Sequence, residues 1–269
     1  MKQVGVFFCL TKGLKTLYPH LGIVVLFVLF LSAIEQIPVL IARLQGFHGN
    51  SVPISLWGFF LCFLSWTTET VAFVGVGQAV WRDPKSKPFE GKCLFPDKEI
   101  HQHLFIWALS FTLVVFMLAT TAELLTDSVS KGGRSIAIPA LPFLFYCTAF
   151  IPLTIADRRI PMISATTHLL TNIQGHWGRL VKLALTAQIV FLVVGTSFIL
   201  LQSFIFSALA ISESVIADQA IWAIAEALIR IINAAMMAVA YVEFNGQGQE
   251  EDTSRDSNSP QNVGSVRAV

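Results

Sequence analysis

The sequence predicts an all-α fold, a polytopic membrane protein built as a six-transmembrane-helix bundle with interfacial helices on its cytoplasmic side. Composition is the first indication, since 54% of the residues are hydrophobic and only 13% are charged, against about 25% charged in soluble domains. The second is the length of the apolar runs, which reach the roughly 20 residues that a helix needs to cross a bilayer. The third is the uneven distribution of lysine and arginine along the chain.

Six apolar runs are long enough to cross a membrane. They are continuously apolar rather than alternating, which favours helices, and helices satisfy their own backbone groups in hydrocarbon. The fourth run contains Pro139, Pro142 and Pro152, so we expect it to be kinked or partly irregular. The six runs cover residues 21–41, 54–80, 104–125, 136–155, 183–209 and 221–241.

We expect one membrane domain over residues 1–244, followed by a polar segment, 245–269, that has almost no large apolar residues. Such a segment cannot bury enough apolar surface to offset the loss of chain entropy, which predicts a disordered cytoplasmic tail. No small-residue cleavage site precedes the first apolar run, so the first span is expected to act as an uncleaved anchor.

The basic residues predict that both termini face the cytoplasm. Of the 18 lysine and arginine residues, 14 lie before the first run, in the second and fourth loops, and after the last run. Short loops rich in lysine and arginine remain on the cytoplasmic side of a membrane. An even number of spans gives the same orientation.

Two of the segments predicted to be cytoplasmic, 1–18 and 163–179, mix apolar with basic or polar residues, as amphipathic helices in the interface do. Basic residues near a membrane surface attract anionic lipid head groups, at about 1 kcal/mol each. Membrane lipids are therefore the predicted partners, while the net charge of +1 gives no indication of nucleic acid. Oligomeric state and protein partners stay open. The lipid-surface candidates are Lys12, Lys15, Lys85, Lys87, Arg158 and Arg159.

Polar residues inside the apolar runs are candidates for a polar cluster or a substrate path. A charge at the bilayer centre costs about 2.5–3.5 kcal/mol, so these side chains should face the bundle interior or water. Glu226 and Arg230 are four residues apart, hence on one helix face and able to pair. The acids are expected at several depths. The candidates are Glu35, Glu69, Glu123, Glu226, Arg230 and Asn233.

Two roles are open for these residues. In one, a neutralised cluster fixes the packing of the helices. In the other, the acids and Arg230 line a polar cavity that binds an ion or an anionic head group.

No catalytic residue, metal site or cofactor is predicted. The chain contains no G-x-S-x-G, P-loop, G-x-G-x-x-G or H-E-x-x-H pattern. Its four cysteines form no C-x-x-C pair, so unpaired thiols are expected. A membrane-embedded lipid enzyme is the weakest alternative, because it would need ionisable residues gathered at one depth.

Four segments carry a resemblance to a known group of proteins. The chain resembles, over roughly residues 1–245, a broad group of bacterial six-helix integral membrane proteins, mostly uncharacterised. This group includes the membrane domain attached to some glycerophosphodiester phosphodiesterases; the phosphodiesterase domain is not found in these 269 residues. The resemblance implies a multi-pass protein of the bacterial cytoplasmic (inner) membrane and transfers no catalytic residue. The segments are "FCLTKGLKTLYPHLGIVVLF", "FVGVGQAVWRDPKSKPFEGKCL", "ISATTHLLTNIQGHWGRLVKLAL" and "NAAMMAVAYVEF".

The function expected from these features is that of a non-enzymatic integral membrane protein, an accessory or scaffold in envelope or lipid homeostasis. The alternative is a transporter or channel in which the intramembrane acids and Arg230 form a polar path.

Overall fold

The computed structural model describes residues 5–44, 56–81, 94–129, 143–173, 176–209 and 215–256. The backbone in these ranges is helical almost throughout and contains no strand, which confirms the all-α prediction. A further helical stretch, residues 143–148, directly precedes α6. The elements are α1 (Val6–Leu17), η1 (Tyr18–His20), α2 (Leu21–Leu44), α3 (Leu56–Trp81), α4 (Lys98–Val129), α6 (Phe150–Arg158), α7 (Met162–Ile173), α8 (Trp177–Leu209) and α9 (Val215–Asp256).

Among the described residues, five helical segments are long and apolar enough to cross a membrane. They indicate a membrane-embedded, multi-pass protein. Four of them contain most of the first, second, third and fifth predicted runs, and the last contains the sixth. The segments are Val6–Ile41, Trp57–Trp81, Lys98–Leu118, Trp177–Phe204 and Ile216–Asn245.

The fourth predicted run, 136–155, is described only from residue 143 onward. Its helix is interrupted by a turn at Ala149, three residues before Pro152, which confirms the expected irregularity. Aromatic rings pack this short stretch against α3 and α4: Phe145 stacks on Trp66 at 5.2 Å and meets Phe111 edge-on at 5.6 Å between centroids. Such pairs each contribute about 0.5–1.5 kcal/mol beyond the area that they bury.

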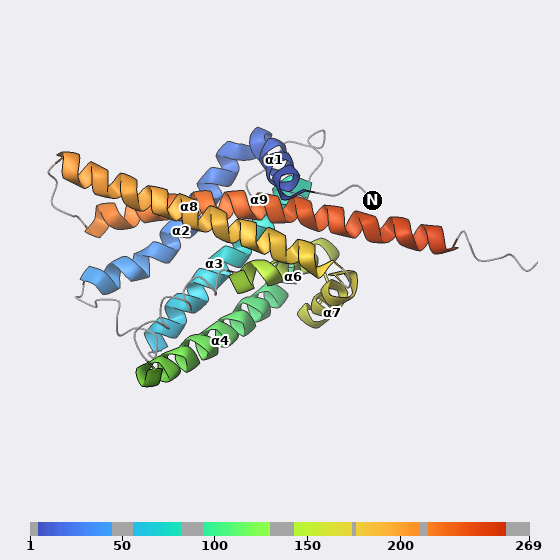
Figure 1. Ribbon diagram of the computed structural model, residues 1–269, viewed down its shortest axis with the longest axis horizontal. Coiled ribbons are helices and arrows are strands. Elements are labelled where there is room, and N and C mark those ends of the chain that lie inside the picture. Colours follow the sequence, from blue (N-terminus) through green and yellow to red (C-terminus); the bar gives the residue numbers. More distant parts are fainter. Residues whose placement is uncertain are drawn as a thin grey trace, which may run out of the picture.

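The last helix, α9, is the centre of the bundle. It contacts α1, α2, α3, α6, α7 and α8, and Figure 1 shows it running through the length of the molecule beside α8. In the 18-residue apolar stretch of this helix 72% of the residues are buried, against 28–44% in those of the other four. The run "NAAMMAVA" at 233–240 explains this position, since small side chains allow neighbouring helices to approach from several sides.

The first helix packs on α9 through a close backbone contact. Its buried face consists of Cys9, Gly13 and Leu17, spaced one turn apart. A Cβ atom at Gly13 would lie 2.6 Å from the carbonyl oxygen of Ala235, so only glycine allows this approach. The helix predicted within 1–18 is therefore present, and its position in the membrane interface stays a prediction.

Buried hydroxyl groups in the helices are satisfied locally. Thr70, Thr112 and Thr154 each donate a hydrogen bond of 2.7 Å to the carbonyl oxygen four residues earlier in their own helix. This arrangement removes the cost of leaving a hydroxyl group without a partner in an apolar environment. Polar residues can therefore lie in these apolar helices without forming a functional site.

Several helices extend beyond the predicted spans. α8 begins six residues before 183, and α4 also begins before its predicted run. α9 continues to Asp256, so residues 245–256 are helical, in contrast to the predicted disorder; residues 257–269 lie outside the described part. Adding residues to an existing helix avoids the cost of nucleating a new one, so a helix can continue past the end of its apolar run. The change from apolar to polar residues therefore marks the edge of the hydrocarbon and not the end of the helix.

We predict that Gly13→Ala destabilises the protein by about 1–3 kcal/mol, because the added methyl group would force α1 away from the backbone of α9. Thermal unfolding in detergent, followed by circular dichroism, measures this effect. Gly22→Ala is the matched control, since nothing lies within 4 Å of its added Cβ. Equal melting temperatures for the two variants would show that α1 is not held on α9 at this point.

Candidate functional site

The candidate site is centred on Arg230, midway along the apolar part of α9. The residue is only 1% exposed and is one of the largest fully buried side chains in the described structure. A guanidinium group cannot lose its charge by deprotonation in a protein, so burial requires partners. Those partners come from α2, α3 and α9 itself.

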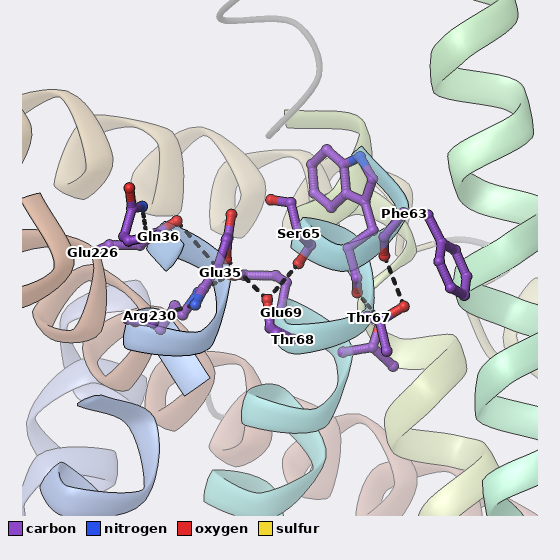
Figure 2. Close-up of polar contacts among 12 residues, drawn as sticks. Glu35, Gln36, Phe63, Ser65, Thr67, Thr68, Glu69, Glu226 and Arg230 are labelled. Carbon is purple, nitrogen blue, oxygen red and sulfur yellow. Dashed lines mark hydrogen bonds and ion pairs between the residues drawn. The ribbon is translucent and has the colours of Figure 1, made fainter. Parts of the chain in front are cut away.

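Three glutamates surround the guanidinium group (Figure 2). Its Nε donates to Glu69 Oε2 at 2.5 Å, while its Nη2 donates to Glu35 Oε2 and to Glu226 Oε1, the latter at 3.0 Å. Acids from α2 and α3 thus approach different edges of the planar group, and the third comes from the preceding turn of α9. The Glu226–Arg230 pair predicted from the spacing is confirmed.

Neutral side chains complete the arrangement. Arg230 Nη1 donates to Ser32 Oγ at 3.1 Å, and Gln36 Nε2 donates to Glu226 Oε2 at 2.9 Å. Thr68 Oγ1 donates to Glu35 Oε2, also at 2.9 Å. Hydrogen bonds to charged groups are worth about 1.5–3 kcal/mol each. All three guanidinium nitrogens therefore have acceptors within the protein.

The charges within this cluster do not balance in number. Three carboxyl groups face one guanidinium group. Their side chains are little exposed, at 10% for Glu35, 12% for Glu69 and 22% for Glu226. Among the described residues no other lysine or arginine is paired with them. Burial of surplus negative charge is costly, so the cluster favours uptake of a proton or of a cation.

The cluster corrects the expectation that the acids lie at several depths. Glu35, Glu69 and Glu226 converge on one side chain because a long guanidinium arm spans about a turn of helix, and its separate nitrogens reach different helices. Glu123 lies on α4, and its side chain is outside the described part of the structure. The three hydrogen-bonding residues Ser32, Gln36 and Thr68 were not predicted.

A sequence signal for those three residues exists in their spacing. Ser32, Glu35 and Gln36 lie at positions i, i+3 and i+4 of α2 and therefore share one face. The set Ser65, Thr68 and Glu69 repeats this spacing in α3. A polar stripe on one face of an apolar helix indicates a buried polar contact, which a search for charged residues alone overlooks.

Asn233 lies one turn beyond Arg230 and begins a second polar group. Its Nδ2 donates to the hydroxyl oxygen of Tyr146 at 2.8 Å and to the carbonyl oxygen of Ala187 at 3.3 Å. Its Oδ1 has no hydrogen-bond partner in the described structure, and neither amide atom of the buried Gln188 has one. Unpaired polar atoms thus continue from α9 toward α8, where water could satisfy them.

The lipid-surface candidates on α1 are exposed. Lys12 pairs with Glu243 of α9 at 2.6 Å and lies 5.2 Å from the centre of the Phe8 ring. Lys15 stands in the last turn of α1 and is exposed as well. Lys85 and Lys87 lie outside the described residues.

Two adjacent arginines at the end of α6 differ in their surroundings. Arg159 adopts a left-handed conformation with φ 53°, which ends the helix, and it pairs with Asp97 at 2.6 Å. Arg158, also exposed, has no ion pair or hydrogen bond with any described residue and lines a cavity of about 410 Å³. Burial lowers the pKa of the nearby His168, and the charge of Arg158 lowers it further. Of the two cations that line this cavity, Lys12 is paired with Glu243, and Arg158 has no ion pair with a described residue.

No three histidine, cysteine, aspartate or glutamate side chains among the described residues are arranged to hold a metal ion. Cys9, Cys62 and Cys147 are free thiols, and Cys93 lies outside the described part.

No protein-family model matches the chain, and no match is found among curated proteins or solved structures.

We predict that Arg230→Met destabilises the protein by about 3–5 kcal/mol, because it leaves buried carboxylates without their cation. Replacing Glu35, Glu69 and Glu226 by glutamine in the same chain should restore much of this loss. Thermal unfolding in detergent measures both effects. The control is Arg159→Met, which breaks an exposed ion pair worth about 0–1 kcal/mol. An effect of Arg230→Met no larger than that of the control would rule out the cluster as a stabilising element.

Proposed function

We propose that the protein is a non-enzymatic, multi-pass accessory or scaffold protein that acts at anionic lipid surfaces. The proposal includes six membrane spans, cytoplasmic termini and interfacial helices, and a location in the bacterial cytoplasmic membrane. The resemblance to bacterial six-helix membrane proteins and the distribution of basic residues support these finer points.

The observation that carries the proposal is that the charged residues inside the bundle are paired with one another, whereas the basic residues on α1 are exposed at the surface. Inside the bundle, Arg230 has acceptors for all of its nitrogens within the protein. Two cavities lined by described residues, of about 410 and 180 Å³, lie away from this cluster. Because the guanidinium nitrogens are already satisfied by the protein, the arrangement favours a structural role for the cluster over catalysis on a lipid.

The surface of α1, by contrast, combines positive charge with exposed apolar groups. Lys12 and Lys15 lie beside the exposed Phe7, Phe8 and Leu14, of which Phe7 is 76% exposed. η1, which contains Pro19, separates α1 from α2, so α2 alone can cross the membrane while α1 takes another direction (Figure 1). Amphipathic helices in the interface have this combination of residues.

We predict that replacing Lys12, Lys15, Lys85 and Lys87 together by glutamine removes most of the preference for anionic lipid. Each basic residue near the surface contributes about 1 kcal/mol to this attraction. Quenching of the tryptophan fluorescence by brominated phosphatidylglycerol, relative to brominated phosphatidylcholine, measures the preference after reconstitution.

Raised salt is the control, because screening should lower the preference of the wild-type protein as well. An unchanged preference in the fourfold variant would contradict the proposed role.

A transporter or channel is the second candidate, supported by the excess of carboxyl groups around Arg230 and by the unpaired atoms of Asn233 and Gln188. Together they suggest a polar path from α2 and α3 toward α8. Along such a path a proton or cation would move between the acids, with Arg230 as the fixed charge. A ligand that occupied the cluster would also lower its surplus charge.

Thiol accessibility tests for this path. In a chain without native cysteines, single cysteines replace Gln188 and Asn233, and open membrane fragments are treated with a membrane-impermeant maleimide. A water-filled path predicts labelling at both positions. Lys15→Cys is the positive control and Leu200→Cys, on an exposed apolar face of α8, the negative control. Labelling no stronger than at position 200 would exclude the path.

A further inference from the structure

A cavity of about 410 Å³ lies between α1, α3, α6 and α9, away from the Arg230 cluster. Its size is within the range of pockets that hold small molecules, about 300–1,000 Å³. Charged, aromatic and aliphatic side chains line it together. Those that matter here are Lys12, Trp81, Asp157, Arg158, Tyr241 and Val242.

The charged groups of the cavity leave one cation available. Asp157 accepts a hydrogen bond of 2.9 Å from the Tyr241 hydroxyl group, and Lys12 is paired with Glu243. Arg158 has no ion pair or hydrogen bond with another described residue. A guanidinium group offers a fork of N–H donors that matches two oxygens of a phosphate group.

The aromatic side chains suit an amphiphilic ligand at a membrane surface. The Trp81 ring donates from Nε1 to the carbonyl oxygen of Ala238 at 3.3 Å and lies 5.4 Å from the Tyr241 ring. Tryptophan and tyrosine favour the zone between head groups and acyl chains. Both residues lie at the end of the apolar segment of their helices.

Apolar surface continues beside this cavity. Val242, which lines it, is 46% exposed, and Phe8 next to Lys12 is 46% exposed as well. A soluble anion would gain nothing from these groups, whereas acyl chains would cover them. The charge and the apolar surface together therefore favour a lipid over a free anion.

We propose that this cavity binds the phosphodiester group of a glycerophospholipid. Arg158 is the contact to the phosphate, and the Asp157–Tyr241 hydrogen bond holds the wall of the cavity in place. The inference rests on the proposed action at lipid surfaces and adds to it a defined site for one lipid molecule.

Native mass spectrometry of the full chain in detergent tests the site, with dioctanoyl-phosphatidylglycerol as the probe. Dioctanoylglycerol, which has the same acyl chains and no phosphate, is the matched ligand control. We expect Arg158→Gln to weaken binding of the phospholipid roughly tenfold or more, because a charge-assisted hydrogen bond is worth about a decade in affinity. Arg158→Lys, which keeps the charge without the fork, should lose less.

Arg159→Gln is the matched protein control, since Arg159 pairs with Asp97 and does not line the cavity. Equal binding by the Arg158→Gln and Arg159→Gln variants would overturn the site, as would equal binding of dioctanoylglycerol by the wild-type protein. Displacement of the lipid by inorganic phosphate at equal concentration would show an anion site without lipid selectivity and would also overturn it. Arg158 is exposed and has no ion pair or hydrogen bond with a described residue, so its variants should keep the melting temperature of the wild-type protein.

Failure of this site is distinguishable from failure of the proposed surface role. Lys15 does not line the cavity, so Lys15→Gln should lower the preference for anionic lipid in vesicles and leave phospholipid binding in detergent unchanged. If Lys15→Gln behaves so and Arg158→Gln has no effect, the surface role stands and the cavity site is wrong. If Arg158→Gln loses the bound lipid and Lys15→Gln has no effect on the preference, the site stands without the surface role.

Discussion

The ion pairs of Arg230 set the arrangement of the helices around it. A guanidinium group in an apolar bundle must find fixed acceptors, since no bulk water is present to replace them. Its donors lie in one plane and point outward along different edges, so they are satisfied only when α2, α3 and α9 meet at a common height and rotation. Hydrocarbon packing alone would allow these helices to slide along or rotate against one another; the cluster selects one register.

The central place of α9 follows from two properties of its sequence that act together. Arg230 attracts acids from two neighbouring helices, and the alanine-rich turns that follow let other helices approach its backbone. Gly13 of α1 meets Ala235 in this way, at a distance that no other residue would permit. The ion pairs of Arg230 determine which helices meet, and the small side chains allow the helices to pack closely. Close packing is the main source of attraction between helices in lipid.

In the described part of the chain, basic residues at the surface are not all neutralised by acids, in contrast to Arg230 in the interior. Arg158 and Arg159 are neighbours in the sequence, yet the left-handed conformation of Arg159 ends α6 and sends the two side chains to different surroundings. Arg159 meets Asp97, while Arg158 faces the cavity beside Trp81 and Tyr241. One change of backbone direction therefore separates a neutralised cation from one that can bind an anionic group.

The sequence by itself determined the helical class, the positions of most apolar helices and the Glu226–Arg230 pair. These features depend on composition and on spacing within single helices, which hydrophobic periodicity and the 3.6-residue turn report directly. The pairing of Glu35 and Glu69 with Arg230 needed the tertiary structure, because the sequence does not state which helices are neighbours or how they are rotated. The cavity at Arg158 needed it for the same reason, since its walls come from four helices that are distant along the chain.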